Sequence, residues 1–175
     1  MDVEGQPWRG RPDAPITIVQ FSNYTSALCA QSDRFIRDLM TEFPAKIRWV
    51  HRNYFNRIDE TALAAAKIGE WAQEKDRFWA FHDALGALGG AVALPDIERI
   101  AREAGLDLNG FHAADPPGVF LGRVKADLEI GRKLGVTSAP VFFVNGLYFS
   151  GTFPYNRLRE IVIEELANHG GSHAN

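Results

Sequence analysis

The sequence predicts an α/β fold with a short mixed central sheet, built in the order β-α-β, a helical insertion, then β-β-α. Two observations carry this prediction. The first third of the chain has a strand, a helix and a second strand in succession, and residues 141–150 contain two apolar runs joined by Asn145-Gly146. The apolar faces of such a sheet must be covered, so we expect helices on both of them.

A βαβ unit begins the fold. Residues 16–21, ITIVQF, form a short β-branched and apolar run that is typical of a buried strand. Apolar residues then recur at helical spacing from Cys29 to about Thr41. Residues 46–51, KIRWVH, alternate in the period of two that a strand shows. Because the two strands are joined by a helix, they should be parallel with a right-handed crossover.

The middle of the chain is helical. Pro95 fits a first helical turn and Gly105 fits a C-terminal cap. Three apolar stripes at helical spacing lie between the second strand and the hairpin; their members are Ala64, Ile68, Trp71 and Ala72, then Ile97, Ile100, Ala101 and Ala104, then Leu121, Val124 and Leu128. These helices form an insertion at about residues 57–135.

A hairpin and a last helix complete the predicted fold. Asn145 and Gly146 both tolerate a positive φ, and this pair between two apolar runs is a strong hairpin signal. Residues 155–167 then carry apolar side chains on one face, as an amphipathic helix does. We find no internal repeat, and we predict that residues 1–175 form a single domain that contains the helical insertion.

Composition narrows the classes of function. Apolar residues make up 46% of the chain, and 19 Lys and Arg against 22 Asp and Glu leave a net charge of −3, so no nucleic-acid partner is expected. The weakly polar run at residues 85–94 is half the length of a membrane-spanning helix, so no membrane insertion is expected. With one cysteine, Cys29, no intramolecular disulfide can form. The compartment stays open: cytoplasmic if this is the full-length chain, periplasmic or secreted if a signal peptide was removed.

Three stretches resemble the DsbA-like branch of the thioredoxin superfamily. They are DAPITIVQFSNY, RFWAFHDAL and GVTSAPVFFVNG, and the likeness runs from about Arg11 to Leu166. The resemblance implies a thioredoxin fold, with an entry strand, a first insertion helix and a loop that contains a cis-proline at Pro140. An exposed backbone at Ala139 would then pair with an extended peptide or with glutathione, since pairing with a free strand edge is a common recognition mode.

The family's Cys-x-x-Cys pair has its counterpart here in Ser26-Ala27-Leu28-Cys29, behind Tyr24. A thiol at a helix N-terminus faces free N–H groups and the positive end of the helix dipole, which favours the attacking thiolate. The second thiol resolves the mixed disulfide. The chain therefore keeps the resolving position and lacks the attacking one. Because the two residues between also differ from the family's usual proline and aromatic, we favour natural divergence over an engineered change.

By this resemblance the site residues fall in two groups. The catalytic positions are Ser26 and Cys29, and the substrate-binding positions are Tyr24, Ala27, Leu28, Ala139 and Pro140. Read from the residues alone, Ser26 is either a helix N-cap or a ligand-binding hydroxyl, and Cys29 is either a small buried residue or a reactive monothiol. The histidines lack metal-ligand spacing, so we expect no metal and no cofactor, with glutathione as a possible ligand.

Three functions remain open. The first is a thiol-disulfide oxidoreductase relative whose dithiol exchange is lost or strongly reduced, with a peptide or glutathione groove beside Pro140. The second is a redox-silent binding or chaperone-like module that uses the same groove. The third is a glutathione-dependent isomerase or transferase that uses Ser26, since such enzymes look similar in fold, although Cys29 has no role in them. The sequence gives no indication of the oligomeric state.

Overall fold

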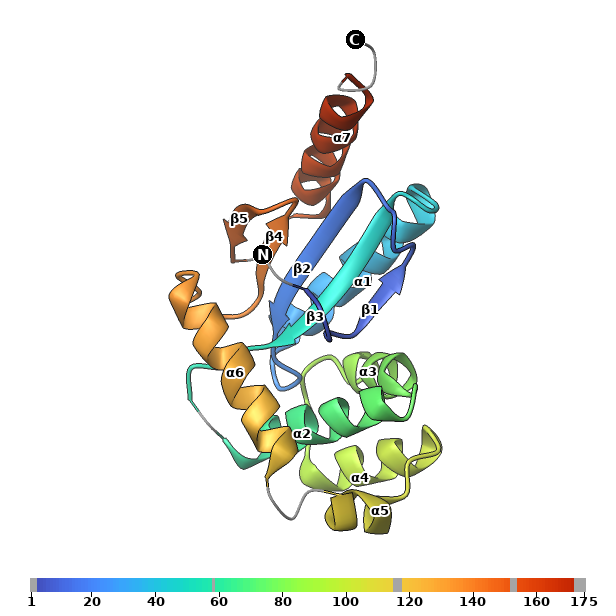
Figure 1. Cartoon of the computed structure of the whole chain (residues 1–175), viewed down its shortest axis with the longest axis vertical. Coiled ribbons are helices and arrows are strands. Elements are labelled where there is room, and N and C mark those ends of the chain that lie inside the picture. The colour runs from blue at the N-terminus through green and yellow to red at the C-terminus, as the bar shows by residue number, and fades with distance from the viewer. Residues whose placement is uncertain (1–2, 58, 115–117, 152–153, 172–175) are drawn as a thin grey trace.

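The structure is a computed structural model, and it describes residues 3–57, 59–114, 118–151 and 154–171. Within these residues the strands are β1 (Trp8–Gly10), β2 (Ile16–Ser22), β3 (Ile47–Asn53), β4 (Val141–Val144) and β5 (Leu147–Ser150). The helices are α1 (Ala27–Glu42), α2 (Glu60–Glu74), α3 (Phe78–Ala87), α4 (Leu94–Glu103), α5 (Leu108–Ala114), α6 (Val119–Lys133) and α7 (Tyr155–Gly171). Figure 1 shows their arrangement.

The strands form one mixed sheet in the order β1-β3-β2-β4-β5. β2 and β3 are parallel, with Ile16 opposite Ile47, and the other neighbouring pairs are antiparallel. The predicted βαβ unit, hairpin and mixed sheet are therefore confirmed. The sequence does not predict β1, because three residues are too few to show a period of two. It lies at the sheet edge, where the Arg48 guanidinium lies over the Trp8 ring at 4.8 Å.

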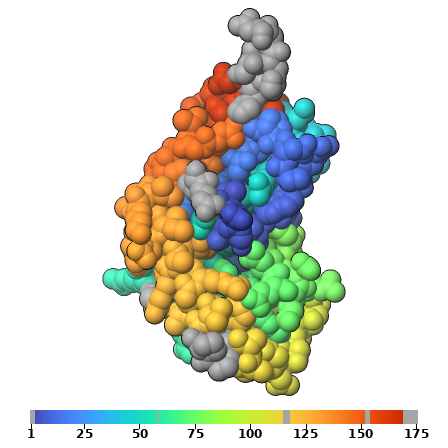
Figure 2. All heavy atoms as spheres, viewed as in Figure 1, coloured from blue at the N-terminus to red at the C-terminus, as the bar shows by residue number. Residues whose placement is uncertain are grey.

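Helices cover both faces of the sheet. On one face, Ile36 and Leu39 of α1 and Leu158 of α7 pack in one cluster with Ile18 of β2 and Trp49 of β3. On the other face, α2 and α6 contribute Ala62, Ala66, Val124 and Leu128 to a second cluster with strand residues of β2, β3 and β4. The space-filling view shows α6 running along one side of the molecule from the sheet to the insertion (Figure 2).

Helices α2 to α6 lie between β3 and β4, where the sequence predicts the insertion. They share a core of their own, which includes Trp71, Phe81, Ile97 and Phe120. Tyr24, from the turn after β2, belongs to that same core. The insertion is therefore packed directly against the segment that contains the candidate site. The division into a single domain over residues 1–175 stays a prediction, and residues 1–2 and 172–175 lie outside the described part.

Candidate functional site

The SALC segment lies at the start of α1. Strand β2 ends at Ser22, and the side chain of Asn23 then accepts hydrogen bonds from the backbone N–H and the hydroxyl of Thr25, both at 3.0 Å. This turn leads into Ser26, which has an extended backbone and whose Oγ accepts a hydrogen bond from the N–H of Cys29 at 3.3 Å. Ser26 is thus the N-cap of α1, which is the first of the two roles considered for it, the other being a ligand-binding hydroxyl.

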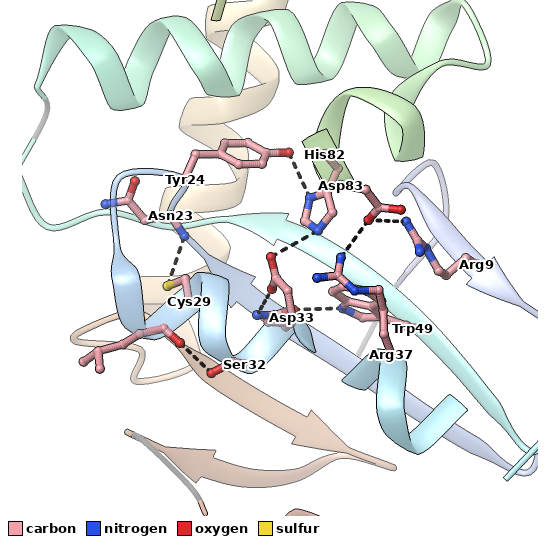
Figure 3. Close-up of polar contacts among 12 residues, drawn as sticks. Arg9, Asn23, Tyr24, Cys29, Ser32, Asp33, Arg37, Trp49, His82 and Asp83 are labelled. Carbon is pink, nitrogen blue, oxygen red and sulfur yellow. Dashed lines mark hydrogen bonds and ion pairs between the residues drawn. The ribbon is translucent and has the colours of Figure 1, made fainter. Parts of the chain in front are cut away.

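Cys29 is enclosed. Only 1% of its surface is exposed, and its Sγ accepts a hydrogen bond from the N–H of Asn23 at 3.4 Å (Figure 3). Burial raises the pKa of the thiol, and the charge of Asp33 raises it further, whereas hydrogen bonds from Ser26, Asn23 and Ser22 act in the opposite direction. The net shift is upward, so at neutral pH the side chain is a thiol with little thiolate, which makes it a weak nucleophile.

A chain of buried polar side chains lies one helical turn below Cys29. Asp33 of α1 accepts a hydrogen bond from Gln20 Nε2 at 2.7 Å, and Gln20 Oε1 accepts one from Trp49 Nε1 at 2.9 Å. The second oxygen of Asp33 lies 3.3 Å from Nε2 of His82 in α3. Burial alone would raise the pKa of Asp33, but the charge of His82 and the contacts with His82 and Gln20 hold it below its usual value. The buried carboxyl is therefore ionised.

Tyr24 ends this chain. Its hydroxyl lies 3.1 Å from Nδ1 of His82, and its ring stacks on His51 at 5.6 Å. Figure 3 shows the phenol directed toward His82 and away from Cys29. Burial lowers the pKa of His51 to about 3, and the charge of His82 adds to this, so the His51 ring is neutral. The family resemblance predicts Tyr24 as a substrate-binding residue; the structure places it in the core beneath the turn, with 8% of its surface exposed.

Sequence reasoning misses this buried chain. Two signals are available: Gln20 is a polar residue inside the apolar run ITIVQF, and Asp33 follows Cys29 by four positions and so shares its helix face. The third member, His82, comes from a helix far along the chain, and neither periodicity nor spacing connects it to Asp33. From the sequence, His82 is a packed or surface histidine, and the structure buries it completely.

A second buried polar group lies at the C-terminal end of β3. Asp127 of α6 pairs with Arg52 at 2.6 Å and accepts a hydrogen bond from the N–H of Asn53 at 2.9 Å. The Asn53 side chain also donates to Glu70 of α2 at 2.9 Å. Burial raises the pKa of Glu70 to about 7, and the charge of Asp127 adds to this. The group borders a cavity of about 570 Å³, between α2, α6 and the N-terminal segment.

The loop before β4 lies beside the same strand end. The Ala139-Pro140 bond is cis, as predicted. The register of the sheet places Val141 opposite Phe21, so Pro140 is next to the end of β2 from which the turn begins. A hydrogen bond holds the start of this loop, because the hydroxyl of Tyr54 donates to the carbonyl of Val136 at 2.5 Å. The Ser26 turn and the proline loop therefore lie at the same end of the sheet.

The surface at this end of the sheet is partly apolar. Leu28 has 49% of its surface exposed although it is in the first turn of α1, and Ala27 beside it is also exposed. In the proline loop Thr137 and Ser138 are exposed, and Ala139 is half-buried. Of the predicted binding residues, Ala27, Leu28 and Ala139 are thus accessible, whereas Pro140 is buried.

The described residues contain no group of three or more His, Cys, Asp or Glu side chains that could hold a metal ion. Within the same part of the chain, every helix is too short or too polar to cross a membrane. At the two motif positions of the turn, Ser26 supplies a hydroxyl and Cys29 an enclosed thiol.

Comparison with known proteins identifies the family. The family model described as thioredoxin matches residues 2–164. The chain belongs to the thioredoxin family. Among solved structures, a thioredoxin-like oxidoreductase from Silicibacter pomeroyi superposes with a TM-score of 0.82 at 23% identity over 94% of each chain. The thiol-disulfide exchange protein alpha-DsbA2 from Wolbachia pipientis gives 0.78 at 22% identity, over 92% of this chain and 87% of that one. The predicted thioredoxin fold of the DsbA-like type is confirmed.

Two curated relatives add to this. Disulfide bond formation protein D of Bacillus subtilis is 26% identical over 181 residues, which cover 94% of this thioredoxin-family chain and 78% of the relative. A protein named Na(+)/H(+) antiporter NhaA 3, from Salinispora tropica, is 31% identical over 171 residues, 96% of this chain and 26% of the relative. The chain spans about a quarter of the length of the antiporter-named relatives that it matches.

Proposed function

We propose that this thioredoxin-family protein has lost or strongly reduced dithiol exchange and binds an extended peptide or glutathione beside Pro140. One observation carries the proposal: Ser26 occupies the attacking position of the motif, and Cys29, the one cysteine in the sequence, has 1% of its surface exposed. Exchange of a disulfide requires a thiolate that can reach the substrate and a second thiol that resolves the intermediate. This chain has neither an accessible thiolate nor a second thiol.

Ser26 is a poor substitute for the missing thiol. A hydroxyl has no redox chemistry and needs an adjacent base before it can attack. The Oγ of Ser26 is held by the N–H of Cys29, and the neutral ring of His51 is enclosed beneath Tyr24. This arrangement weighs against the isomerase or transferase alternative, in which Ser26 would face the sulfur of glutathione.

The accessible surface at the turn supports the binding part of the proposal. Leu28 offers an exposed apolar side chain, and Ala139 is half-buried at the end of the sheet. An extended peptide can use both, by pairing with backbone groups and seating a side chain against an apolar surface. In the antiporter-named relatives, a segment like this chain makes up about a quarter of a longer protein.

The redox part is tested by activity assays on the unmodified protein. We expect no catalysis of insulin reduction or of dithiol oxidation, and no difference between the unmodified protein and Cys29→Ala. Robust turnover that Cys29→Ala abolishes would overturn the proposal, since it would show that one thiol suffices.

The origin of the segment is tested by Ser26→Cys. Residues 26 and 29 are three positions apart at a helix start, a spacing that brings two sulfurs within bonding reach. We expect the new thiol to form a disulfide with Cys29 under mild oxidant, located by mass spectrometry. Thr25→Cys is the matched control, since it adds a thiol one position earlier in the turn and should not pair. If both variants titrate as free thiols, SALC is not a decayed dithiol motif.

The binding part is tested by titration with glutathione and with an unstructured peptide. We expect Leu28→Asp to weaken peptide binding at least about fivefold, since it removes the apolar contact that seats a peptide side chain. Leu147→Asp is the control, because Leu147 is an equally exposed leucine, with 51% of its surface accessible, on the edge strand β5. Equal effects of the two substitutions, or no saturable binding of either ligand, would remove the groove from the proposal.

A further inference from the structure

Helices α1 and α3 meet along a line of contacts that runs toward the candidate site. Arg37 of α1 pairs with Asp83 of α3 at 3.0 Å. One turn closer to the N-terminus of α1, a Cβ placed on Gly86 would lie 3.5 Å from the carboxylate of Asp33. The two helices thus run in opposite directions, and each turn of α3 brings the insertion closer to the start of α1.

Gly90 continues this line into the Ser26 turn. A Cβ placed on Gly90 would lie 2.6 Å from the carbonyl carbon of Ser26 and 2.7 Å from Cα of Ala27, and closer still to the Ala27 nitrogen. Real Cβ atoms do not approach backbone so closely. The loop between α3 and α4 therefore rests backbone against backbone on the first residues of α1, a contact that only glycine permits.

The turn under this loop is also what covers Cys29. The Sγ of Cys29 receives a hydrogen bond from the N–H of Asn23, and Ser26 caps the helix through the N–H of Cys29. Ser26 is in turn tied back to Asn23, because its N–H donates to the Asn23 carbonyl at 3.2 Å. A displacement of Ser26 and Ala27 would consequently move the groups that enclose the thiol.

We propose that Gly90 is a positioning residue, which seats the α3–α4 loop on the backbone of Ser26 and Ala27 and so keeps the turn closed over Cys29. The helical insertion then limits access to the Cys29 thiol. This restriction is separate from the loss of the attacking thiol at position 26. This inference concerns the same turn as the proposed function. It rests on that proposal only for one consequence, namely that both the missing thiol at position 26 and the closed turn suppress thiol exchange.

The test uses Cys29 as its own reporter, since every labelling event on this chain occurs at that residue. We compare Gly90→Ala with Gly89→Ala. Both glycines have a positive φ, of 90° and 66°, so both substitutions carry a backbone penalty, but a Cβ on Gly89 would meet nothing within 4 Å. The measurement is the native-state rate of Cys29 labelling by a thiol reagent, together with the stability of each variant to denaturant.

We expect Gly90→Ala to label roughly ten- to a hundredfold faster than Gly89→Ala, because overpacking of this contact lifts the loop. The excess labelling should depend little on denaturant, as a local opening does. Equal labelling of the two variants, once corrected for global stability, would overturn the proposal.

A second measurement needs no substitution at position 90 and decides the case if Gly90→Ala does not fold. In the unmodified protein, Cys29 should label through a local opening that is more frequent than global unfolding and nearly independent of denaturant. A closure made by this one loop contact should open before the rest of the fold does. Labelling that follows only global unfolding would mean that the whole fold encloses the thiol, and it would overturn the proposal. Neither measurement contains peptide, glutathione or insulin, so this inference and the proposed function can fail separately.

Discussion

The turn at Ser26 and the buried chain beneath it differ in how far their hydrogen bonds reach along the sequence. Within the turn, hydrogen bonds join residues two to six positions apart, as between Thr25 and Asn23, Ser26 and Cys29, or Asn23 and Cys29. In the buried chain, the hydrogen bonds join residues separated by up to 58 positions, from β2, α1, β3 and α3. A local turn can change its side chains without disturbing the rest of the fold. In the buried chain, by contrast, each side chain is the hydrogen-bond or ion-pair partner of another buried side chain.

This difference bears on why the motif position tolerates a serine. Replacing a thiol by a hydroxyl at Ser26 keeps an N-cap, because an oxygen accepts the N–H of Cys29 well. Loss of Asp33 would instead leave Gln20 and His82 without their partner in a region closed to water. The motif positions and the buried carboxylate that stabilises the fold are therefore separated by one helical turn of α1.

The largest effect is expected for Asp33→Ala. Removal of a buried carboxylate strands the groups that bond to it, so we expect a loss of about 3–5 kcal/mol in the free energy of unfolding. The control is Asp38→Ala, on the same helix but exposed, which should change stability by no more than about 0.5 kcal/mol. Chemical denaturation of both variants measures this. Similar, small losses for the two would mean that the buried chain is not a source of stability.

The same difference in reach explains what the sequence could predict. The βαβ unit and the hairpin follow from local patterns, and the structure confirms them. The N-cap at Ser26 is one of the two interpretations that the sequence allows, and the structure shows that cap. The pairing of Asp33 with His82 depends on how α3 docks on α1, which no local pattern reports. The approach of Gly90 to Ala27 is hidden for the same reason, since a glycine in a loop between two helices looks like any other turn residue.

A smaller effect, which depends on pH, is expected at Glu70. Its pKa is about 7 in the folded protein and its ordinary value is 4.5, so the folded state binds this proton more tightly than the unfolded state. The free energy of unfolding should therefore fall as pH rises from about 4.5 to 7, by a total on the order of 3 kcal/mol. Unfolding by denaturant across this range measures the slope.

Glu70→Gln should remove most of this slope and make the protein more stable at about pH 8 than the unmodified form, because an amide carries no charge to desolvate. Its amide oxygen can still accept the hydrogen bond from Asn53. Glu74→Gln, on the same helix but exposed and paired with Arg123 at 2.6 Å, is the matched control and should leave the slope unchanged. An unaltered slope in Glu70→Gln would assign the pH dependence to other groups.

The smallest effect is expected for Ser26→Ala, and it tests directly whether the turn is energetically local. Loss of the N-cap leaves the N–H of Cys29 without its partner, which should lower the free energy of unfolding by about 1 kcal/mol. Ser32→Ala is the matched control on the same helix: its hydroxyl bonds back to the Leu28 carbonyl at 2.8 Å, and because alanine is the better helix former this change should be within about 0.5 kcal/mol. If Ser26→Ala lowered the free energy of unfolding nearly as much as Asp33→Ala, the turn would not be energetically local, and the distinction between the two regions would be wrong.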